Sequence, residues 1–360
     1  MRPVAAGDPL ENWLKRFYES GGNTVDPEIW QGTFETLKKA AATGTGINLA
    51  KTAYNSPDFR LQTQLEQNAG VFAAFKNHQE QEQLVRLLKD EKGSVRTWSQ
   101  FLNEARPLTG QYNRNWLKTE YNQAVANAQM AKKWIGFEEN ADIYPNLEYR
   151  AVMDQRTRPE HAILNGIIRP INDPFWSRNY PPNGWGCRCS VVQTDRDVTP
   201  GKSVPDFKPD PGFDFNPGID KKLFADSAGH YQTTDKKQVR EIGEKLTNKA
   251  SRSFGISQVG KVAKVKGLGD VNITKKGIKE AVNQPHAEYY AKNAALENIS
   301  GMIKGLKFKT LPGVKNNPMV KQYHYAEIEL MGKTSYVILR EMVDGEIRFY
   351  TITDTMKGYQ

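Results

Sequence analysis

The sequence predicts an α+β protein built from several domains, and three observations support this fold class. The chain has 360 residues, which is more than one small domain needs. Apolar residues recur at helical spacing through residues 10–140. Three strand-like runs separated by turn signals follow near the C-terminus. The expected order is a helical region (1–84), a domain with a small irregular α/β knot rich in Trp, Pro and Cys (85–195), a Pro/Gly-rich linker with a polar connection (196–250), and a basic domain of helices packed on a small antiparallel sheet (251–360).

The composition is that of folded domains joined by polar segments. Apolar residues make up 38% and aromatic residues 10% of the chain, and a wholly disordered chain would lack so many aromatic side chains. No run approaches the ~18 apolar residues of a membrane span. The first eight residues lack the apolar stretch of a secretory signal. We therefore expect no membrane partner and no secretion.

The two cysteines indicate a reducing compartment. Cys187 and Cys189 are separated by one residue, and a disulfide across so short a ring is strained. A disulfide framework is therefore not expected, and the chain is predicted to assemble in a reducing interior.

The N-terminal part is predicted to form several helices. One apolar stripe runs from Leu84 to Lys89 and a longer one from Trp116 to Trp134. Gly136 is placed just past the end of the second helix, because glycine is common at that position. Glycines at residues 21–22 and 44–46 are predicted to separate the helices.

The middle of the chain has a different character. Residues 149–153 alternate in polarity like a short strand, and the valines at 191–192 indicate another. The stretch between them is dense in Pro, Gly, Asn and Trp, and Trp176 and Trp185 are expected to form a miniature core. Residues 197–220 hold five prolines and three glycines, which favours an extended linker or a surface-wrapping arm.

The last 110 residues are predicted to form a separate α+β domain. Two helices are expected, from Thr274 to Val282 and from Pro285 to Ile303. Three strands are expected at residues 323–330, 334–340 and 346–353, joined at the turn signals Met331-Gly332-Lys333 and Asp344-Gly345.

Three residues of the middle segment have the composition of a zinc site. His161, Cys187 and Cys189 offer an imidazole and two thiolates, which are three of the four ligands of a tetrahedral zinc ion. The residues alone leave open the alternative of buried structural thiols beside a packing histidine. A zinc enzyme is not favoured, because no open metal position with a general base is evident. No cofactor is expected unless these three residues bind zinc.

Two spaced motifs and the helix before them resemble a known family. The first motif is Asp154-x-Arg156-Thr157-Arg158-Pro159-x-His161, followed by Gly166. The second is Asp173-Pro174-Phe175-Trp176, then Pro181-Pro182-Asn183-Gly184-Trp185-x-Cys187-Arg188-Cys189. The helix before them covers Thr119 to Ala131. Over about residues 85–195, the chain resembles the phage Mu F-type minor head protein family.

The resemblance implies a head morphogenesis protein. Such proteins are present in few copies, associate with the portal or with capsid and scaffold proteins during capsid assembly, and in some members contact the packaged DNA. It implies a structural or docking role for the motif residues and a location in the virion, or in the host cytoplasm during assembly. Relatives often place Cys at the positions of Arg158 and His161, with a His just ahead of Cys-Arg-Cys, and this sequence retains only His161. The alternative is an ordinary helical domain with no phage role.

Positive charge is concentrated in the C-terminal domain. Residues 251–325 hold 13 Lys and Arg against four Asp and Glu, and this surplus equals the net charge of +9 of the whole chain. Such a stretch attracts polyanions, and nucleic-acid phosphate is the commonest of them. Packaged DNA or a target RNA is therefore an expected partner. A solvated lysine-rich surface is the alternative.

The C-terminal domain also resembles, over about residues 255–356, a phage-associated subgroup of the barnase/EndoU/colicin/RelE-like RNases. The residues that carry this resemblance are Thr274-Lys275-Lys276-Gly277-Ile278-Lys279, Gln284-Pro285-His286-x-x-Tyr289-Tyr290-x-Lys292-Asn293, Tyr323-His324-Tyr325 and Gly345-x-x-Arg348-Phe349-Tyr350-Thr351-Ile352-Thr353-Asp354.

Ribonuclease chemistry without a metal needs a base for the 2′-hydroxyl proton, an acid for the leaving oxygen, and cations for the phosphorane. His286 is the candidate base or acid. Lys292 and Arg340 are the candidate cations, and Arg340 can clamp a phosphate bidentately. The remaining candidates are the hydroxyls of Tyr350, Thr351 and Thr353 and the carboxylate of Asp354, which could orient the histidine.

Each candidate also has a plainer interpretation. His286 could cap a helix or face solvent, and Lys292 and Arg340 could be solvated charges. Thr353 and Asp354 could merely end a strand, and His324 is read as a strand-packing residue. The sequence holds no glycine-rich phosphate loop and no nucleophile elbow.

Two hypotheses follow, and they do not exclude each other. In one, the chain is a phage minor head protein whose tail is an RNase-like domain delivered as a toxin with the genome. In the other, the chain is a purely structural head component whose basic tail binds DNA or scaffold without catalysis.

Overall fold

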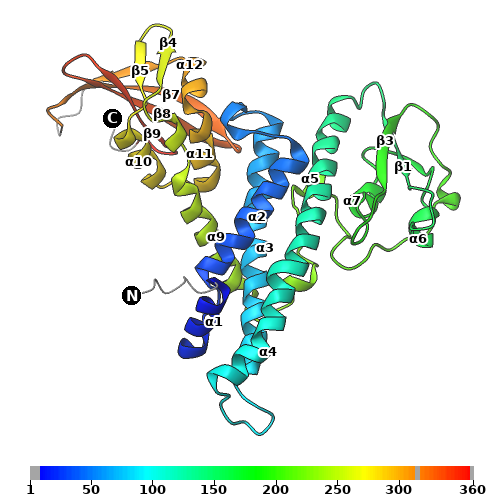
Figure 1. Cartoon of the computed structure of the whole chain (residues 1–360). Helices are drawn as coiled ribbons and strands as arrows, with labels where there is room; N and C mark the ends of the chain where they lie inside the picture. Colours follow the sequence, from blue (N-terminus) through cyan, green and yellow to red (C-terminus); the bar gives the residue numbers. More distant parts are fainter. Residues whose placement is uncertain (1–8, 313–316, 357–360) are drawn as a thin grey trace. The chain divides into compact units, whose positions relative to one another are not determined.

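The computed structural model describes residues 9–312 and 317–356, and the chain divides into two compact units (Figure 1). The N-terminal unit comprises Met1–Thr45 and Asn68–Lys245, and the C-terminal unit comprises Gly46–Gln67 and Leu246–Gln360. Both units combine helices with strands, which confirms the predicted α+β class. Within the described ranges, no helix is both long enough and apolar enough to span a membrane.

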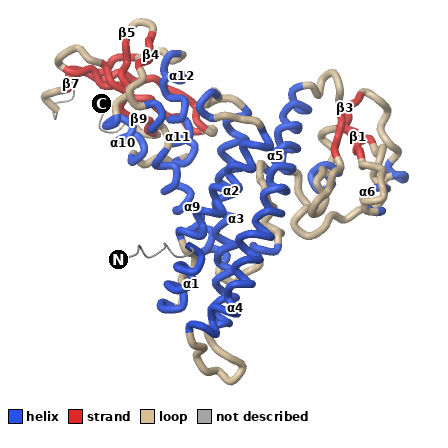
Figure 2. Tube along the Cα trace, viewed as in Figure 1, coloured by secondary structure: helices blue, strands red, loops and turns tan. Residues whose placement is uncertain are grey.

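Long helices dominate the N-terminal unit, as the periodicity predicts. They are α1 (Pro9–Ser20), α2 (Pro27–Thr45), α3 (Pro57–Leu87), α4 (Trp98–Gly110) and α5 (Leu117–Glu139), with a π-helical turn η2 (Gln111–Trp116) ahead of α5 (Figure 2). Proline opens three of these helices, because its fixed φ suits the first turn and its missing N–H would have no partner there. Residues 57–67 of α3 belong to the C-terminal unit, together with the short turn η1 (Leu49–Lys51).

The predicted end of α5 is wrong by one turn. Gly136 was expected just past the helix, but α5 continues to Glu139. The helix tolerates Gly136 in its interior at a modest cost in conformational entropy. It ends where the Asn140 side chain donates a hydrogen bond of 2.7 Å to the Gly136 carbonyl and so closes the last turn.

Helices α2 and α5 pack closely at Gly44. A Cβ atom at this position would lie 2.4 Å from the carbonyl oxygen of Val125 and 2.6 Å from the Cβ of Ala128. The two backbones therefore approach each other to a distance that only glycine permits. Gly32, in the same helix, would have no atom within 4 Å of such a Cβ.

Replacing each of these two glycines by alanine is expected to change the free energy of unfolding in opposite directions. Gly44→Ala should lower the free energy of unfolding by about 1–3 kcal/mol, because the added methyl group pushes α2 away from α5. Gly32→Ala should raise it by roughly 0.5–1 kcal/mol, because alanine has the better helix propensity. Urea denaturation followed by circular dichroism measures both changes. Equal effects of the two substitutions would contradict the close approach.

A three-stranded antiparallel sheet follows α5 in the N-terminal unit. β1 (Asn146–Arg150) lies between β2 (Ile168–Pro170) and β3 (Ser190–Thr194), and the short helices α6 (Pro159–Ala162) and α7 (Phe175–Asn179) lie in the connections. The strand expected at 191–192 is confirmed. The strand expected at 149–153 begins earlier and stops at Arg150, because the amide of Ala151 bonds to the Asn165 side chain.

The core beside this sheet contains Trp176 but not Trp185. Trp176 is fully buried and packs with Trp134 of α5, whereas Trp185 is 43% exposed. The expected Trp176–Trp185 core is therefore wrong. Tyr180, rather than Trp185, packs in this core, with its ring centroid 5.1 Å from that of Trp134. The Trp185 ring instead meets the edge of Phe213 at 5.3 Å.

The Pro-rich connection wraps the N-terminal unit as an arm, which matches the second of the two alternatives. It contains the short turns η3 (Gly201–Ser203), α8 (Pro217–Asp220) and η4 (Gly229–Tyr231) and leads into α9 (Lys236–Ala250). Asn68 of α3 anchors it: the side-chain oxygen accepts from the amides of Leu223 and Phe224, and the side-chain nitrogen donates to the Phe224 carbonyl. Both anchored residues are buried.

The C-terminal unit contains a six-stranded sheet with short helices. The strands are β4 (Val262–Val265), β5 (Gly269–Asn272), β6 (Lys309–Pro312), β7 (Val320–Leu330), β8 (Lys333–Met342) and β9 (Ile347–Thr353), in the order β4-β5-β9-β8-β7-β6. All neighbours are antiparallel except β5 and β9, which are parallel. The predicted three-strand meander is confirmed as β7-β8-β9, and the sequence analysis missed the other three strands.

One predicted helix of this unit is broken. The first expected helix is α10 (Lys275–Asn283), whose N-cap Thr274 accepts from the Gly277 amide. The second was expected from Pro285 to Ile303 but is divided into α11 (Tyr289–Ala295), the turn η7 (Leu296–Asn298) and α12 (Ile299–Lys304). Gln284 is extended, as residues before proline tend to be, and α11 starts only at Tyr289.

Candidate functional site

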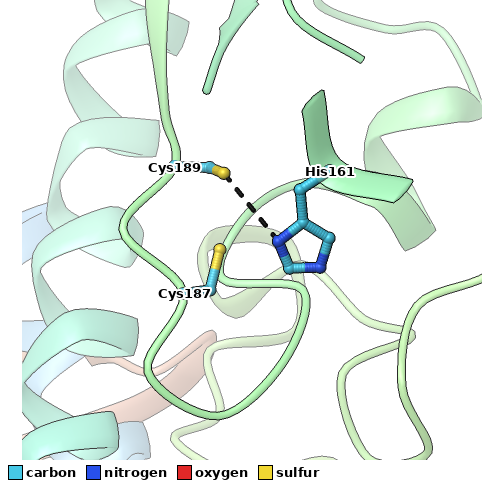
Figure 3. A group of neighbouring side chains, drawn as sticks. All are labelled: His161, Cys187 and Cys189. Carbon is cyan, nitrogen blue, oxygen red and sulfur yellow. Dashed lines mark hydrogen bonds between the residues drawn. The ribbon is translucent and has the colours of Figure 1, made fainter. Parts of the chain in front are cut away.

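His161, Cys187 and Cys189 point toward one another in the N-terminal unit (Figure 3). His161 lies on α6, and the two cysteines lie in the loop that enters β3. Their ligand atoms are all within 4.8 Å of one another, and the Cys189 sulfur is 4.0 Å from Nδ1 of His161. His161 and Cys189 are buried. The structure therefore brings together the three residues that the sequence analysis grouped.

The pKa values of the two thiols shift in opposite directions. A hydrogen bond from the Cys187 thiol, together with one from His161, lowers the pKa of Cys189. The same thiol–thiol hydrogen bond, together with burial, raises the pKa of Cys187 well above its usual range. Thiolate is the form that binds metals, so the lowered pKa favours Cys189 as a metal ligand.

Three ligands of a tetrahedral zinc site fit this group. Bonds of ~2.3 Å to sulfur and ~2.1 Å to nitrogen put neighbouring ligand atoms about 3.6 Å apart, close to the 4.0 Å between Cys189 and His161. The other residues around the group are Arg156, Thr157, Arg158, Gly186 and Arg188. They supply no carboxylate, imidazole or thiolate, so a bound ion would take its fourth ligand from solvent.

Zinc at this group stays a prediction. We expect Cys189→Ser to lower the zinc content of the purified chain by about one ion, because it removes the thiolate of the set. Elemental analysis of wild type and variant, prepared side by side, measures the difference. Val191→Ala, a nearby apolar truncation that leaves the ligands in place, is the control. Equal zinc contents in wild type and C189S would contradict the prediction.

The other motif residues form structural ties. Arg188 donates two hydrogen bonds to Asp154, which lowers the pKa of that carboxyl group well below its usual range. Asp173 accepts from the side chain of Arg169 and from the Phe175 amide at the start of α7. The Arg156 amide donates to the Asp154 side chain, and the Thr157 hydroxyl donates to the Val152 carbonyl. The side-chain oxygen of Asn183 accepts from the Tyr149 hydroxyl.

Gly184 permits the loop to approach the arm. A Cβ atom at Gly184 would lie 2.4 Å from Oδ2 of Asp210 and 3.1 Å from Nη1 of Arg158. Arg158 in turn donates to the Trp185 carbonyl at 2.9 Å. These contacts hold the motif loop in place while its Trp185 side chain faces outward.

The predicted catalytic residues of the C-terminal unit form two separate groups. His286, Lys292, Thr353 and Asp354 gather where α10, α11 and the end of β9 meet. The Asp354 carboxylate accepts from the Ala287 amide, and the Gln284 side chain reaches the Thr353 hydroxyl. Asp354 opposes the effect of burial on the pKa of both His286 and Lys292, so the three side chains lie near one another.

Both ring nitrogens of His286 are occupied. Nδ1 accepts a hydrogen bond from the Glu288 amide, so the proton of the neutral ring is on Nε2, which donates to the Ser335 hydroxyl at 3.0 Å. The side chain is buried, and burial lowers its pKa. This geometry is that of a structural histidine that fixes the start of α11.

The buried Lys292 side chain caps the C-terminal end of α10. Its buried ammonium group donates to the carbonyls of Ala281 and Gln284, which are at the C-terminal end of α10. A lysine at this end satisfies carbonyls that the helix leaves unpaired. Burial lowers the pKa of Lys292 to about 7. The contacts that it makes are those of a structural cation.

Arg340, Tyr350 and Thr351 belong to the second group. Arg340 is the direct cross-strand partner of Tyr323 on β7 and of Arg348 on β9. The first group's Thr353 pairs instead with Tyr336, four residues along β8, which separates the two groups by roughly 13 Å along the sheet. The structure does not bring Arg340 to His286. Thr351 is buried, and its hydroxyl bonds to the Ile352 carbonyl.

Tyr323, Arg340, Arg348 and Tyr350 form what we name the tyrosine–arginine face. The guanidinium of Arg340 lies 3.2 Å from the ring centroid of Tyr350 and 5.7 Å from that of Tyr323. Like charges directly opposite each other destabilise a sheet, and the Arg340–Arg348 pair is of this kind. Nε of each arginine is buried without a hydrogen-bond partner among the described residues. The Glu346 carboxylate, which accepts a hydrogen bond from Arg348, offsets part of this repulsion.

The sequence analysis missed a cleft in the N-terminal unit, which we name the aromatic cleft. Trp116, Trp185, Phe213 and His230 line a cavity of about 330 Å³. Trp116 and Trp185 are 37% and 43% exposed, which is unusual for so large an apolar side chain. Their exposure and shared cavity indicate a binding surface.

Buried charges lie beneath the aromatic cleft. Nε2 of His230 lies 3.0 Å from a carboxylate oxygen of Glu120, whose other oxygen accepts from the ammonium of Lys76. Lys76 and Glu120 are 1% and 2% exposed. Sequence periodicity offered a signal for them, because each interrupts an apolar helical stripe with a charge.

Two family comparisons cover most of the chain. Residues 60–192 match the family described as "Phage Mu protein F like protein", and residues 238–350 match "Large polyvalent protein-associated domain 3". The first match contains His161, both cysteines and Trp185. The chain therefore carries a Mu F-like domain.

Two curated relatives match a shorter segment. Over 75 residues, the chain is 48% identical to "Putative capsid assembly protein F" of Escherichia phage Mu and 43% identical to "Mu-like prophage FluMu F protein" of Haemophilus influenzae. These segments are 21% of this chain and 17% and 18% of the two relatives, so the alignments span less than a fifth of either relative. No solved structure matches the chain.

Proposed function

We propose that this chain, whose residues 60–192 form a Mu F-like domain, acts in the assembly of a phage head. The observation that carries the proposal is the 48% identity over 75 residues to a protein named for capsid assembly. Its place of action is then the host cytoplasm during assembly, or the virion. Its partners are the portal, capsid or scaffold proteins of the same phage.

The aromatic cleft is the surface that we assign to docking. Interface hot spots are enriched in tryptophan that sits in a pocket rimmed by other contacts. Trp185 belongs to the motif of the Mu F-like domain, and it faces outward beside Trp116 in spite of its size. A partner segment that inserts an apolar side chain between these two rings would bury them both.

Trp185→Ala tests the docking assignment. We expect the variant to fold like the wild type, because its side chain is 43% exposed, and to lose at least tenfold in association with heads assembled by the encoding phage. Copurification of the chain with heads, quantified against the capsid protein, is the measurement. Ile143→Ala, an exposed apolar truncation outside the cleft, is the control.

Two outcomes of this experiment have separate meanings. Wild-type incorporation of W185A would remove the docking assignment and leave the assembly role in place. Complete, filled heads from a phage that lacks the whole chain would overturn the assembly role itself.

For the C-terminal unit, we favour a binding module for nucleic acid with exposed bases. The supporting observation is the tyrosine–arginine face, where the half-buried cation Arg340 stacks on the ring of Tyr350, and cations and aromatic rings are the groups that contact nucleic acids. The buried contacts of His286 and Lys292 favour binding without catalysis. Ribonuclease activity and delivery as a toxin stay predictions, and an assay for RNA cleavage by the full chain and by H286A tests them.

A further inference from the structure

A second group of possible metal ligands lies on the N-terminal unit, apart from the thiol group. His78 and Glu82 are one turn apart on α3, and Asp235 directly precedes α9. One ligand atom from each lies within 4.8 Å of the others. Neither the family comparisons nor the resemblance seen in the sequence gives these residues a role.

The hydrogen bond of Nδ1 fixes where the lone pair of the His78 ring lies. Nδ1 lies 2.9 Å from the carbonyl oxygen of Thr24, which can only accept, so Nδ1 carries a proton. Nε2 then holds the lone pair of the neutral ring. Histidines that bind metals are commonly oriented by such an N–H to carbonyl bond on the far nitrogen. The ring is 6% exposed and therefore held in this orientation.

The two carboxylates near Nε2 lie at ion-pair distances, slightly farther away than ligands of one shared ion. Oε1 of Glu82 is 3.6 Å away and Oδ2 of Asp235 is 3.9 Å away, beyond the ~2.7–3.2 Å of a hydrogen bond. Ligand atoms about 2.1 Å from one ion lie ~3.0–3.4 Å apart. Both carboxylates are about half exposed, so a small rotation of each side chain closes the difference. The Thr233 hydroxyl, 3.2 Å from Nε2, donates to this lone pair in the metal-free chain and has to turn away when an ion binds.

The charge and the ligand types select the ion. A neutral imidazole with two carboxylates carries −2, which matches a divalent cation. Calcium and magnesium prefer all-oxygen sites, whereas imidazole nitrogen favours zinc and its neighbours in the transition series. We propose that His78, Glu82 and Asp235 bind a divalent transition-metal ion of the zinc class. The ion joins α3 to the turn before α9 and has a structural role.

The test separates this site from the thiol group. In C187S/C189S, stripped of metal with a chelator, we expect one equivalent of Zn²⁺ to bind in calorimetry. Adding Glu82→Gln and Asp235→Asn should weaken that binding more than tenfold, because these exposed, isosteric changes remove two ligands. Adding Glu241→Gln and Glu244→Gln, at exposed positions of α9, removes the same charge and should leave binding unchanged.

Cobalt gives a second readout. Co²⁺ bound to C187S/C189S should show visible d–d absorption, and this absorption should be lost in the E82Q/D235N background. Absence of saturable Zn²⁺ binding to C187S/C189S would overturn the proposal. Binding that survives E82Q/D235N unchanged would overturn it as well.

Discussion

Replacing Glu120 by Gln is expected to lower the free energy of unfolding by about 3–5 kcal/mol. Glu120 is 2% exposed and accepts hydrogen bonds from Lys76 and from His230. Its removal leaves the ammonium of Lys76, at 1% exposure, inside the helical unit without its counter-ion. The loss is large because a buried unpaired charge keeps its full desolvation cost. Urea denaturation at pH 7 measures it.

Glu80→Gln, four positions from Lys76 on the same helix, is the matched control with the opposite sign. Burial raises the pKa of Glu80 to about 8, against an ordinary value of 4.5. The folded chain therefore holds a proton that the unfolded chain releases, so the wild type loses stability as the pH rises from about 4.5 to about 8. An amide cannot release this proton. E80Q should be more stable than wild type at pH 7, by up to about 3 kcal/mol at 1.36 kcal/mol for each pH unit.

The pH dependence gives the comparison a second measurement. The advantage of E80Q should shrink toward zero near pH 4.5, where both states of the wild type hold the proton. If E80Q and E120Q destabilised the chain alike, at every pH, the assignment of a neutral Glu80 beside an ionised Glu120 would be wrong.

Local signals in the sequence predicted much of the fold. The meander β7-β8-β9 could be predicted because Met331-Gly332 and Asp344-Gly345 are turn signals between runs of strand-forming residues. The start of α10 could be predicted because Thr274 is a common type of N-cap residue. In both cases the information lies within a few residues of the element. The domain boundaries at residues 84, 195 and 250 stay a prediction.

Long-range pairing could not be predicted in this way. The parallel pair of β5 and β9 joins Val271 to Ile347, which are 76 positions apart, and four-residue strands such as β4 and β6 carry little periodicity. The error at Pro285–Ile303 has a local cause. Proline favours the first turn of a helix, but it also disfavours the helical conformation of the residue before it, and here the helix starts only at Tyr289.

The candidate sites divide in the same way. His161, Cys187 and Cys189 were grouped from residue type alone, and the structure places them together. The predicted helix from Pro285 to Ile303 contains both His286 and Lys292, but α11 begins at Tyr289, so His286 is not on that helix. Lys292 is buried against the end of α10 by tertiary packing, and the spacing of residues within one segment carries no information about such packing.

Exchanging Arg340 and Tyr350 together for alanine is expected to weaken the binding of single-stranded nucleic acid by the full chain at least tenfold. Base–aromatic stacking contributes ~1–3 kcal/mol for each base, and the lost guanidinium removes one phosphate or stacking contact. Fluorescence anisotropy with a labelled oligonucleotide, at two salt concentrations, measures the affinity. Arg340 also stacks on Tyr350, so the thermal stability of the variant must be measured alongside.

Two controls give this last prediction its meaning. Lys279→Ala removes one exposed cation from α10. It should lower the affinity only slightly, and the affinity of the variant should depend less on salt than that of the wild type. His286→Ala should leave affinity unchanged, because its ring bonds to Glu288 and Ser335 inside the unit. Undiminished binding by a folded R340A/Y350A chain would remove the tyrosine–arginine face as the binding surface. RNA cleavage by the wild type that disappears in a folded H286A chain would instead favour the catalytic hypothesis, since a structural histidine has no reason to control the reaction.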